Sequence, residues 1–536
     1  MMDRRTIYVI LICFLIFFGW NKYLTTKYPN YGNKQITPTA TSVQTPGEDS
    51  QANNTEATTG SKLAKQDAIG GSHEQKSGGL VRPESEVRFE SETLSFSVSS
   101  RGMGLKDIVL NGYTDKEKNK IKLGQSDEKR IFEVRMGALA QPLDFNLRAL
   151  GDGKFVGEAS FGTTIIEREM KFDKKSYSFS SITTITQATD EILKGVRFYL
   201  PEKITVKPST SFLFPSYEHQ DFFVGFGGKS ETVNFSAAKE DVRKEITGAS
   251  LVALSSQYFT TAFLDKSDIL PDANLASSTA QKSAIAEVVY HPATIQDSYK
   301  FEQIFYVGPK SIDILKAANA EFAKVIDFGM FEFIATPLLY VMKYFFEIVS
   351  NWGIAIILLT LLVRLLVLPF NIMSMKSMKA MQKIQPLMTS VREKFKDDPV
   401  RMNQEIMALM KENKANPLGG CLPMLLQIPI FFALYRVIGS SIELYQSPFF
   451  GWINDLSHHD RFYVLPVLMG ITMYVQQKMT PTNMDPAQAK IMAFLPLIFT
   501  FFMLQLPSGL TLYMFVSALF GITQQWYMLR DKTSEG

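Results

Sequence analysis

The stretch "LLTLLVRLLVLPF", residues 358–370, places one arginine, Arg364, inside a run of leucine and valine. Burying an arginine in a bilayer costs about 2.5–3.5 kcal/mol, whereas each large aliphatic residue returns about 0.3–0.6 kcal/mol. The aliphatic residues between Gly353 and Phe370 outweigh that cost, so the segment is still expected to insert as a helix. Because Arg364 does not help the helix to cross the membrane, it is the first candidate for a functional residue.

Apolar residues are distributed unevenly along the chain. Of its 536 residues, 46 % are hydrophobic, and the net charge of +3 favours neither nucleic-acid binding nor disorder. Long apolar runs dominate from Asn351 onward, whereas residues 85–310 show the mixed pattern of a soluble domain. We therefore predict a membrane α-helical protein with six transmembrane helices that also carries a large soluble part.

The amino-terminal region is predicted to be an anchor followed by a tether. "TIYVILICFLIFFGW" (6–20) follows two arginines and lacks a small-x-small cleavage site, so residues 1–24 are interpreted as an uncleaved transmembrane anchor. Residues 25–84 are rich in Thr, Ser, Gly and Asn, which is typical of a flexible linker. The only cysteines are Cys13 and Cys421, so the soluble region is expected to fold without disulfides.

The soluble region alternates apolar and polar residues with a period of two. In "VRFESETLSFSVSS" (87–100), the residues Leu94, Phe96 and Val98 share one face. Such runs, broken by Gly, Pro and Asn, predict an all-β sandwich domain over 85–328 that ends in a helix at "PKSIDILKAANAEFAKVIDFG" (309–329). No carboxylate pair with a defined spacing stands out, which favours a structural or docking module over an enzyme.

Residues 329–350 are predicted to form an interfacial amphipathic helix. "FEFIATPLLYVMKYFFEIV" (331–349) mixes aromatic residues with Lys343 and Glu347, a pattern that suits a helix lying on the outer leaflet better than a span.

The orientation follows from the distribution of basic residues. The loop 371–420 holds nine Lys or Arg, and the carboxyl-terminal tail (531–536) follows Arg530 and contains Lys532. By the positive-inside rule both termini and this loop are cytoplasmic, and the β domain lies on the outer side of the membrane. The core at 351–530 is expected to hold five spans, at about 352–370, 422–442, 462–478, 491–505 and 510–529.

Two of the predicted spans are short. "FYVLPVLMGITMYV" and "IMAFLPLIFTFFML" are uninterrupted apolar cores of fourteen residues each. That is about 21 Å of helix against about 30 Å of hydrocarbon. Either flanking polar residues snorkel to complete the crossing, or the bilayer is thinned around these helices.

Polar residues on other spans are candidate neighbours of Arg364. Arg364 lies six residues, or about 9 Å, from Phe370, so simple snorkelling to the headgroups is one interpretation. The alternative is a wet groove, open to the cytoplasm, that polar groups of four spans line together. No acidic residue lies within a span to pair with Arg364, which counts against pumps and favours an anionic polypeptide as its partner. The candidate groove residues are Arg364, Thr360, Gln427, Thr472, Gln476, Tyr513, Ser517 and Gln524, with Gly521 in the same stripe as the last three.

The cytoplasmic loop is predicted to be a helical hairpin over 371–418. "DDP" (397–399) supplies an N-cap and a first-turn proline for its second helix. The hairpin is either a solvated basic structure or a flexible platform for nascent chain, ribosome or targeting receptor. The platform residues would be Met375, Met378 and Met381 on one helical face, with Lys376, Lys379 and Lys383 displaced from it.

Four stretches together resemble the YidC family of membrane protein insertases. They are "NWGIAIILLTLLVR" (351–364), "NPLGGCLPMLLQIPIFFALY" (416–435), "LPVLMGITMYVQQKMTP" (465–481) and "LPSGLTLY" (506–513). The anchor, tether and large β domain are similar to the Gram-negative form. One departure is Met514, because many relatives carry an aromatic residue directly after the tyrosine of the last motif.

The resemblance implies a five-helix core around a hydrophilic groove that receives substrate tails. It also implies a hydrophobic slide for apolar segments at Ile428, Phe431 and Phe502. The expected partners are nascent membrane proteins and the lipid bilayer, together with ribosome, targeting receptor and Sec translocon components. No nucleotide-binding motif appears in the sequence, so we expect no nucleotide cofactor. An insertase role also implies no catalytic residues, no metal and no small-molecule substrate. The alternatives are a small-molecule transporter or channel, and a carbohydrate enzyme on a membrane anchor.

Overall fold

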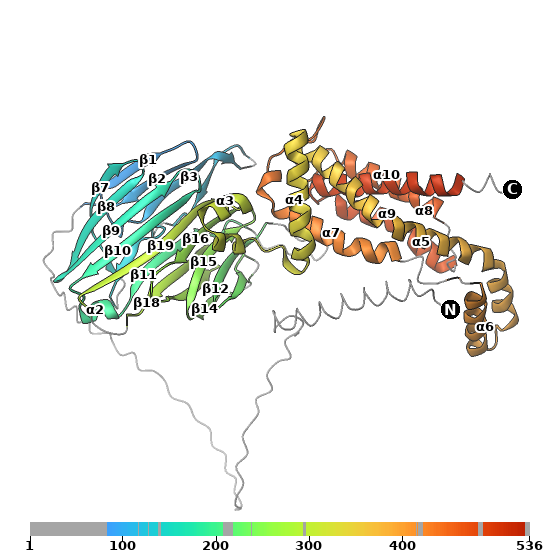
Figure 1. Ribbon diagram of the computed structural model, residues 1–536, viewed down its shortest axis with the longest axis horizontal. Helices are drawn as coiled ribbons and strands as arrows, with labels where there is room; N and C mark the ends of the chain where they lie inside the picture. Colours follow the sequence, from blue (N-terminus) through green and yellow to red (C-terminus); the bar gives the residue numbers. More distant parts are fainter. Residues whose placement is uncertain are drawn as a thin grey trace, which may run out of the picture. The chain divides into compact units, whose positions relative to one another are not determined.

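The computed structural model describes residues 83–530, apart from 116, 127, 138–140, 207–217, 237, 239, 293–295, 414, 416–421 and 481–485. The predicted anchor at 1–24, nearly all of the linker at 25–84 and the predicted tail at 531–536 lie outside the described residues. The described chain is built mainly of strands up to Pro309 and of helices from Ile312 onward (Figure 1).

Three antiparallel sheets form the domain between residues 86 and 309. Their strand orders are β1-β2-β3-β4, then β13-β12-β15-β16-β19-β10-β9-β8-β7, and β14-β17-β18-β11-β5-β6. The domain is all-β, as the alternating pattern predicted. Its elements are β1 (Glu86–Glu90), β2 (Leu94–Ser99), β3 (Leu105–Thr114), β4 (Lys120–Leu123), β5 (Val134–Met136), β6 (Gln141–Pro142), β7 (Asn146–Gly151), β8 (Lys154–Phe161), β9 (Thr164–Asp173), β10 (Ser178–Thr186), α2 (Asp190–Leu193), β11 (Val196–Lys203), β12 (Gln220–Phe226), β13 (Lys229–Asn234), β14 (Arg243–Ile246), β15 (Ala249–Ser256), β16 (Phe259–Asp265), β17 (Asp272–Ser278), β18 (Ser283–Tyr290) and β19 (Ser298–Pro309).

The alternation in β2 places its apolar side chains in the core. Leu94, Phe96 and Val98 are all buried, which confirms that they point inward together. The ring of Phe96 lies 5.3 Å from that of Phe172 and 5.1 Å from that of Phe179, both in tilted edge-on contact. Such aromatic packing holds the four-stranded sheet against the nine-stranded sheet.

Arg168 on β9 is a cation inside this apolar core. It is 1 % exposed, and its Nη1 donates hydrogen bonds of 2.8 Å to the carbonyl oxygens of both Gly102 and Phe132. Its guanidinium also lies 5.4 Å from the ring of Phe198 and 5.6 Å from that of Phe305. Burial lowers the pKa of Arg168 to about 9. The side chain thus connects the nine-stranded sheet to the loops that hold Gly102 and Phe132.

The predicted helix at the end of the β domain is divided into two short helices. α3 spans Ile312–Ala318 and the 3₁₀ helix η1 spans Ala320–Val325. Asn319 between them is extended, and its side-chain oxygen accepts a hydrogen bond from the backbone N–H of Glu321. Asparagine competes for backbone hydrogen bonds in this way, which is why one continuous helix does not form.

A short 3₁₀ helix, η2 (Gly329–Phe331), leads into α4 (Glu332–Val349), whose two faces differ in burial. Its predicted position at the membrane interface stays a prediction. Ala335, Leu339 and Met342 are buried on one face. The opposite face exposes large apolar and aromatic side chains, namely Phe333, Tyr340, Tyr344 and Ile348.

The fifth helix, α5 (Trp352–Lys394), is much longer than the predicted span at 352–370. It continues through Pro369 and Pro386 into the region predicted as the first arm of the hairpin. Among the described residues, α5 is the only helix that is both long and apolar enough to cross a membrane by itself. The second arm is α6 (Pro399–Glu412), and Asp398 caps it by accepting a hydrogen bond of 3.0 Å from the N–H of Arg401, as predicted.

Each of the other predicted spans also contains a helix. They are α7 (Leu422–Ser440), α8 (Val464–Met479), α9 (Pro486–Met503) and α10 (Ser508–Arg530), with the short η4 (Ile442–Leu444) after α7. α10 packs against α5 and α8, and α8 packs against α9. Glycines permit two of these approaches, because a Cβ at Gly470 would lie 2.0 Å from Oγ1 of Thr500, and one at Gly521 would lie 2.3 Å from Nε2 of Gln476.

An ion-pair clamp joins the β domain to the helical core. Nζ of Lys343 on α4 lies 2.7 Å from Oδ2 of Asp313 on α3 and 2.7 Å from Oε1 of Glu443 on η4. Lys343 and Glu443 are both mostly buried, and Ser311 donates a further hydrogen bond of 3.1 Å to Glu443. A second contact runs from the hydroxyl of Tyr445 to the carbonyl of Thr114, at 2.7 Å. These contacts fix where the β domain meets the helices.

Replacing Arg168 by leucine is expected to destabilise the β domain by about 3 kcal/mol, because two buried carbonyl oxygens lose their charged donor. None of the four tryptophans lies in this domain, so fluorescence does not report on it. Amide hydrogen exchange of the full chain, followed by mass spectrometry, should show faster exchange in peptides that cover residues 100–104, 132 and β9. Arg148→Leu at an exposed site on β7 is the matched control. Equal exchange in the two variants would contradict the role given to Arg168.

Candidate functional site

Arg364 lies in the apolar part of α5 and faces α10. Its Nε donates a hydrogen bond of 3.2 Å to the hydroxyl oxygen of Ser517. Within the described residues, no carboxylate lies within ion-pair distance of its guanidinium. The arginine is therefore held by a neutral group, and its charge is not neutralised by this part of the protein.

A second hydrogen bond extends this site to a third helix. Nε2 of Gln427 on α7 donates to the hydroxyl of Tyr513, which lies one turn before Ser517 on α10. Tyr513 and Ser517 are both buried. Arg364, Gln427, Tyr513 and Ser517 thus form a polar group, here called the arginine cluster, that draws on α5, α7 and α10.

The two predicted groove threonines bond within their own helices. Oγ1 of Thr360 donates to the carbonyl of Ile356 at 2.6 Å, and Thr360 is fully buried. Oγ1 of Thr472 donates to the carbonyl of Met469 at 2.7 Å. Neither hydroxyl bonds to the arginine cluster, because a threonine in a helix readily satisfies its donor on the preceding turn.

A second polar layer lies nearer the carboxyl-terminal end of α10. Nδ2 of Asn371 on α5 approaches Oε1 of Gln524 at 3.5 Å, and Nε2 of Gln525 donates to Oγ1 of Thr480 at 3.0 Å. Gln476 reaches the same helix beside Gly521. Sequence reasoning missed Asn371 and Gln525. The signal for Asn371 was its spacing of seven residues from Arg364, which places both on one face of α5.

Three buried atoms in this layer have no hydrogen-bond partner among the described residues. They are Oδ1 of Asn371, Nε2 of Gln524 and Oε1 of Gln525. A buried polar group without a partner costs about 1–3 kcal/mol, so such groups are normally bonded to water or to a ligand. The layer is therefore suited to hold water or a polar chain between α5 and α10.

The predicted hydrophobic slide lies partly on the outer surface of the helices. Ile428 on α7 is 43 % exposed, whereas Phe431 is partly buried against the core. Its neighbour Phe432, which the sequence analysis did not select, is 47 % exposed. On α9 the ring of Phe502 is in edge contact with that of Phe501, which is the more exposed of the two. The apolar surface thus includes the neighbours of the predicted residues.

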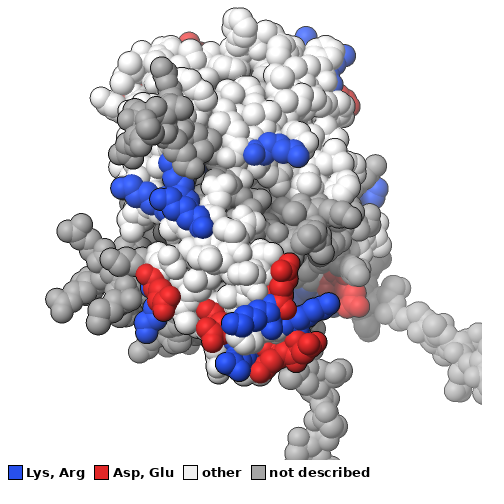
Figure 2. Space-filling model, turned by 90° about the vertical axis from the view of Figure 1, so that its right-hand side faces the viewer, with Lys and Arg blue, Asp and Glu red and all other residues white. Residues whose placement is uncertain are grey.

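The predicted platform residues divide between packing and exposure. Met375 is buried, Met378 and Met381 are partly buried, and Lys376 and Lys383 are exposed. Nζ of Lys379 donates a hydrogen bond of 2.8 Å to the carbonyl of Met528, near the end of α10. The exposed apolar side chains of this hairpin are instead Leu387, Val400 and Met407. Figure 2 faces this end of the molecule and shows acidic and basic side chains interspersed there, with several basic ones set apart.

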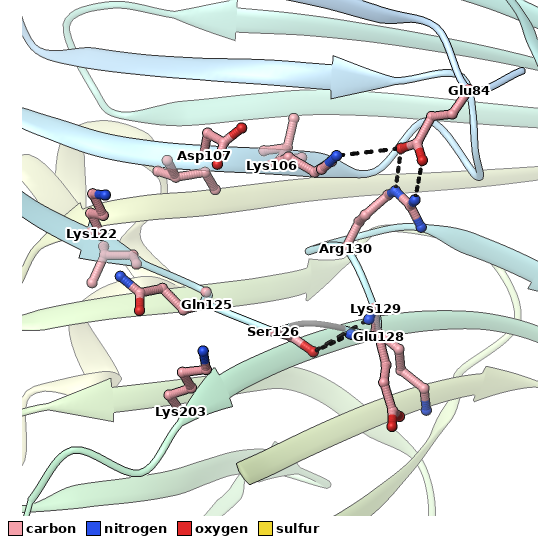
Figure 3. Close-up of a pocket in the computed structure, with 14 residues that line it drawn as sticks. Glu84, Lys106, Asp107, Lys122, Gln125, Ser126, Glu128, Lys129, Arg130 and Lys203 are labelled. Carbon is pink, nitrogen blue, oxygen red and sulfur yellow. Dashed lines mark hydrogen bonds and ion pairs between the residues drawn. The ribbon is translucent and has the colours of Figure 1, made fainter. Parts of the chain in front are cut away.

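A pocket in the β domain is lined by charged residues but is not a strong candidate. Its volume is about 490 Å³, and Lys106, Lys129 and Arg130 lie on its wall (Figure 3). Glu84 lies 2.6 Å from Arg130 and 3.6 Å from Lys106. Desolvation opposes ionisation of Glu84, but the hydrogen bonds from Arg130 and Ser99 outweigh it and lower its pKa to about 2. Arg130 and Lys106, which could bind an anionic ligand in this pocket, are thus already paired with Glu84 of the protein itself.

A helical core that contains a helix able to cross a membrane, joined to an all-β domain, is the arrangement expected of a membrane-integrated protein with a large domain on one side of the membrane. Family models assign both parts. Residues 344–535 match the 60Kd inner membrane protein family, and residues 86–341 match the YidC periplasmic domain. The β domain is therefore periplasmic, and the protein is an inner membrane protein.

Known relatives support the same assignment. The chain is 36 % identical over 445 residues to a membrane protein insertase YidC of Geotalea daltonii, covering 80 % of this chain and 84 % of that relative. It is 54 % identical over 230 residues to the insertase of Geobacter sp. (strain M21), where the alignment covers 43 % of this chain and 42 % of the relative. A crystal structure of an active YidC insertase covers 83 % of this chain and 93 % of its own, at 19 % identity and a TM-score of 0.38. The chain belongs to the YidC family of membrane protein insertases.

The hydrogen bond between Gln427 and Tyr513 is expected to contribute about 0.6 kcal/mol to the stability of the core, as is typical between membrane helices. Tyr513→Phe and Gln427→Leu, alone and together, form a double-mutant cycle. Thermal unfolding in detergent, followed through Trp352, Trp452 and Trp526, measures it. The same change at exposed Tyr527 should leave the melting temperature unchanged. Strictly additive effects of the two substitutions would show that the bond does not stabilise the core.

Proposed function

We propose that this insertase receives polar substrate tails at the arginine cluster, in a hydrophilic groove open to the cytoplasm. The observation that carries the proposal is that Arg364 has a hydrogen bond to Ser517 but no carboxylate partner among the described residues. An unneutralised cation in an apolar helix attracts an anion from outside the protein. A nascent polypeptide with an acidic tail supplies that anion.

The second polar layer supports entry from the cytoplasmic side. Asn371, Gln524 and Gln525 each have one buried polar atom without a described partner, and they lie seven or more residues from the arginine cluster along α5 and α10. Seven residues of helix correspond to about 10 Å. Water or backbone amides of the substrate would satisfy these atoms and provide a polar path from the inner surface to Arg364. Thr472 and Gln476 line the same path in this proposal, and Thr360 lies at its closed end, one turn beyond Arg364 on α5.

Insertion itself needs no cofactor in this mechanism. Burial of an apolar substrate segment contributes about 25 cal/mol per Å² and supplies the driving force. The groove lowers the barrier, because the polar tail stays solvated partway across the membrane. The apolar segment then leaves along Ile428 and Phe431 on α7 and Phe502 on α9, with Phe432 and Phe501 widening that surface. The role is that of an insertase and chaperone rather than an enzyme.

We also propose the topology and partners that the sequence indicated. Six spans with both termini in the cytoplasm place the hairpin of α5 and α6 where a ribosome, a targeting receptor or Sec translocon components approach. The exposed Leu387, Val400 and Met407, with Lys376 and Lys383, form the contact surface. A transporter is not favoured, because the membrane segments offer no acidic residue to couple transport to protons or ions.

Arg364→Gln is expected to reduce insertion of a single-span substrate with an acidic tail by about fivefold. The reason is the loss of an attraction of about 1 kcal/mol between two unit charges in a wet site. A substrate with a neutral tail should be affected much less, and Arg364→Lys should retain most activity. Proteoliposomes containing the full chain, with protease protection of the translocated tail as readout, measure this.

Arg461→Gln is the matched control for this experiment, because Arg461 is an exposed arginine outside the apolar part of α5. Equal losses for acidic and neutral tails would show that Arg364 acts on folding and not as an electrostatic attractor.

Photo-crosslinkers at positions 428 and 502 are expected to capture the apolar segment of a ribosome-held nascent membrane protein. A crosslinker at position 360 should capture its polar tail instead. Leu366, which is exposed on α5 away from the proposed exit, is the control position and should yield lipid adducts only. If all three test positions gave no more substrate adduct than Leu366, the proposed entry of the tail through the groove and exit of the apolar segment along α7 and α9 would be wrong.

A further inference from the structure

A second pocket lies where the periplasmic domain meets the last turn of α7. Its volume is about 430 Å³, which is within the range of small-molecule sites. One wall comes from β12, η1 and the segments that follow β19 and η1, and the other comes from the end of α7. The charged residues that line it are His219, Asp221, Lys310, Asp327 and Arg436.

The charges of this pocket are not paired with one another across it. Asp221, Lys310, Asp327 and Arg436 are close enough to influence one another electrostatically. Yet no ion pair among the described residues joins Lys310 or Arg436 to a carboxylate. Among the described residues, Nζ of Lys310 donates a side-chain hydrogen bond to the carbonyl of Ser256, at 3.2 Å. Two cations and two carboxylates therefore face a hollow instead of neutralising each other.

The carboxylate of Asp221 can accept a further hydrogen bond. Its side chain is 13 % exposed, and its Oδ2 lies 3.4 Å from Nε2 of His219. Its Oδ1 is buried and has no hydrogen-bond partner among the described residues. Burial raises the pKa of Asp221 and lowers that of Lys310 to about 8. Both groups are thus short of the polar contacts that a charged form needs.

A stripe of exposed residues on α7 leads to the same pocket. Leu425, Ile428, Phe432 and Arg436 are all exposed, and their spacing of three and four residues places them on one helical face. The first three are apolar and belong to the lipid-facing surface, whereas Arg436 reaches the pocket. A molecule with a charged head and an apolar tail fits this surface from the pocket down the helix.

We propose that the pocket binds the headgroup of an outer-leaflet phospholipid that carries both a phosphate and a primary ammonium group, as in phosphatidylethanolamine. Arg436 and Lys310 contact the phosphate, and Asp221 and Asp327 accept hydrogen bonds from the ammonium. One acyl chain lies along Phe432, Ile428 and Leu425. A phosphatidylglycerol headgroup offers the two carboxylates only neutral hydroxyl donors, and the methyl groups of phosphatidylcholine block hydrogen bonding to them.

Native mass spectrometry of the purified full chain tests this proposal. The protein in detergent is mixed with equal amounts of dioleoyl phosphatidylethanolamine, phosphatidylcholine and phosphatidylglycerol, and the retained lipid is identified. One phosphatidylethanolamine per chain is expected to be retained preferentially. Asp221→Asn and Arg436→Gln should each weaken its retention about tenfold, since each removes a charge-assisted contact to the headgroup.

The matched controls are Glu158→Gln and Arg148→Gln, which remove exposed charges on β8 and β7, at the opposite edge of the nine-stranded sheet from β13 and β12. They should leave lipid retention unchanged. Arg436 is exposed, so its variant keeps the test valid even if Asp221→Asn fails to fold. Equal retention of the three lipids, or equal effects of pocket and control variants, would overturn the proposal. Equally tight binding of chain-free glycerophosphoethanolamine would overturn the lipid assignment in favour of a soluble ligand.

Discussion

The unneutralised charge of Arg364 is the constraint on which the helical core depends. A guanidinium within apolar α5 is stable only if other helices bring polar groups to it. α10 provides Ser517 by a direct hydrogen bond, and α7 provides Gln427 through Tyr513. The three helices are thereby held in one relative position by polar contacts, whereas packing between apolar membrane helices alone has little hydrophobic driving force. The site is thus also a structural element of the core.

The cation is only partly satisfied, and this is the difference between the binding site that we propose and a structural ion pair. Removing one partner from a buried ion pair is strongly destabilising, because the other charge is left buried alone. If Arg364 served only the stability of the core, a carboxylate beside it or an apolar residue in its place would make the core more stable. Arg168 in the β domain shows the structural solution, because it is fully enclosed and donates to two backbone carbonyls. Arg364 instead keeps part of its donor capacity available, as a site for a transient anionic partner requires.

Much of this architecture is predictable from periodicity and hydropathy. The inward face of β2, the capped α6 and the five helical segments of the core follow from residue spacing and hydropathy. The continuity of α5 through Pro369 and Pro386 did not, because proline within a helix predicts a break or a kink. Side-chain direction was also out of reach. Thr360 and Thr472 share the spacing of the groove residues but bond to their own helices, and Phe432, not its neighbour Phe431, is the outward-facing ring.

The length of the helices bears on how the site lowers the barrier to insertion. α8 has 16 residues and α9 has 18, or about 24 and 27 Å of helix, against about 30 Å of hydrocarbon. The free-energy cost of moving a polar tail grows with the thickness of apolar medium that it crosses. In the proposed mechanism the polar layer at Asn371 and Gln524 removes part of that thickness from the cytoplasmic side. Thinning of the bilayer, one of the two ways to accommodate helices as short as α8 and α9, would remove part of what is left. The clamp at Lys343 joins α3, α4 and η4, and so holds the periplasmic domain against the segment that follows the outer end of α7.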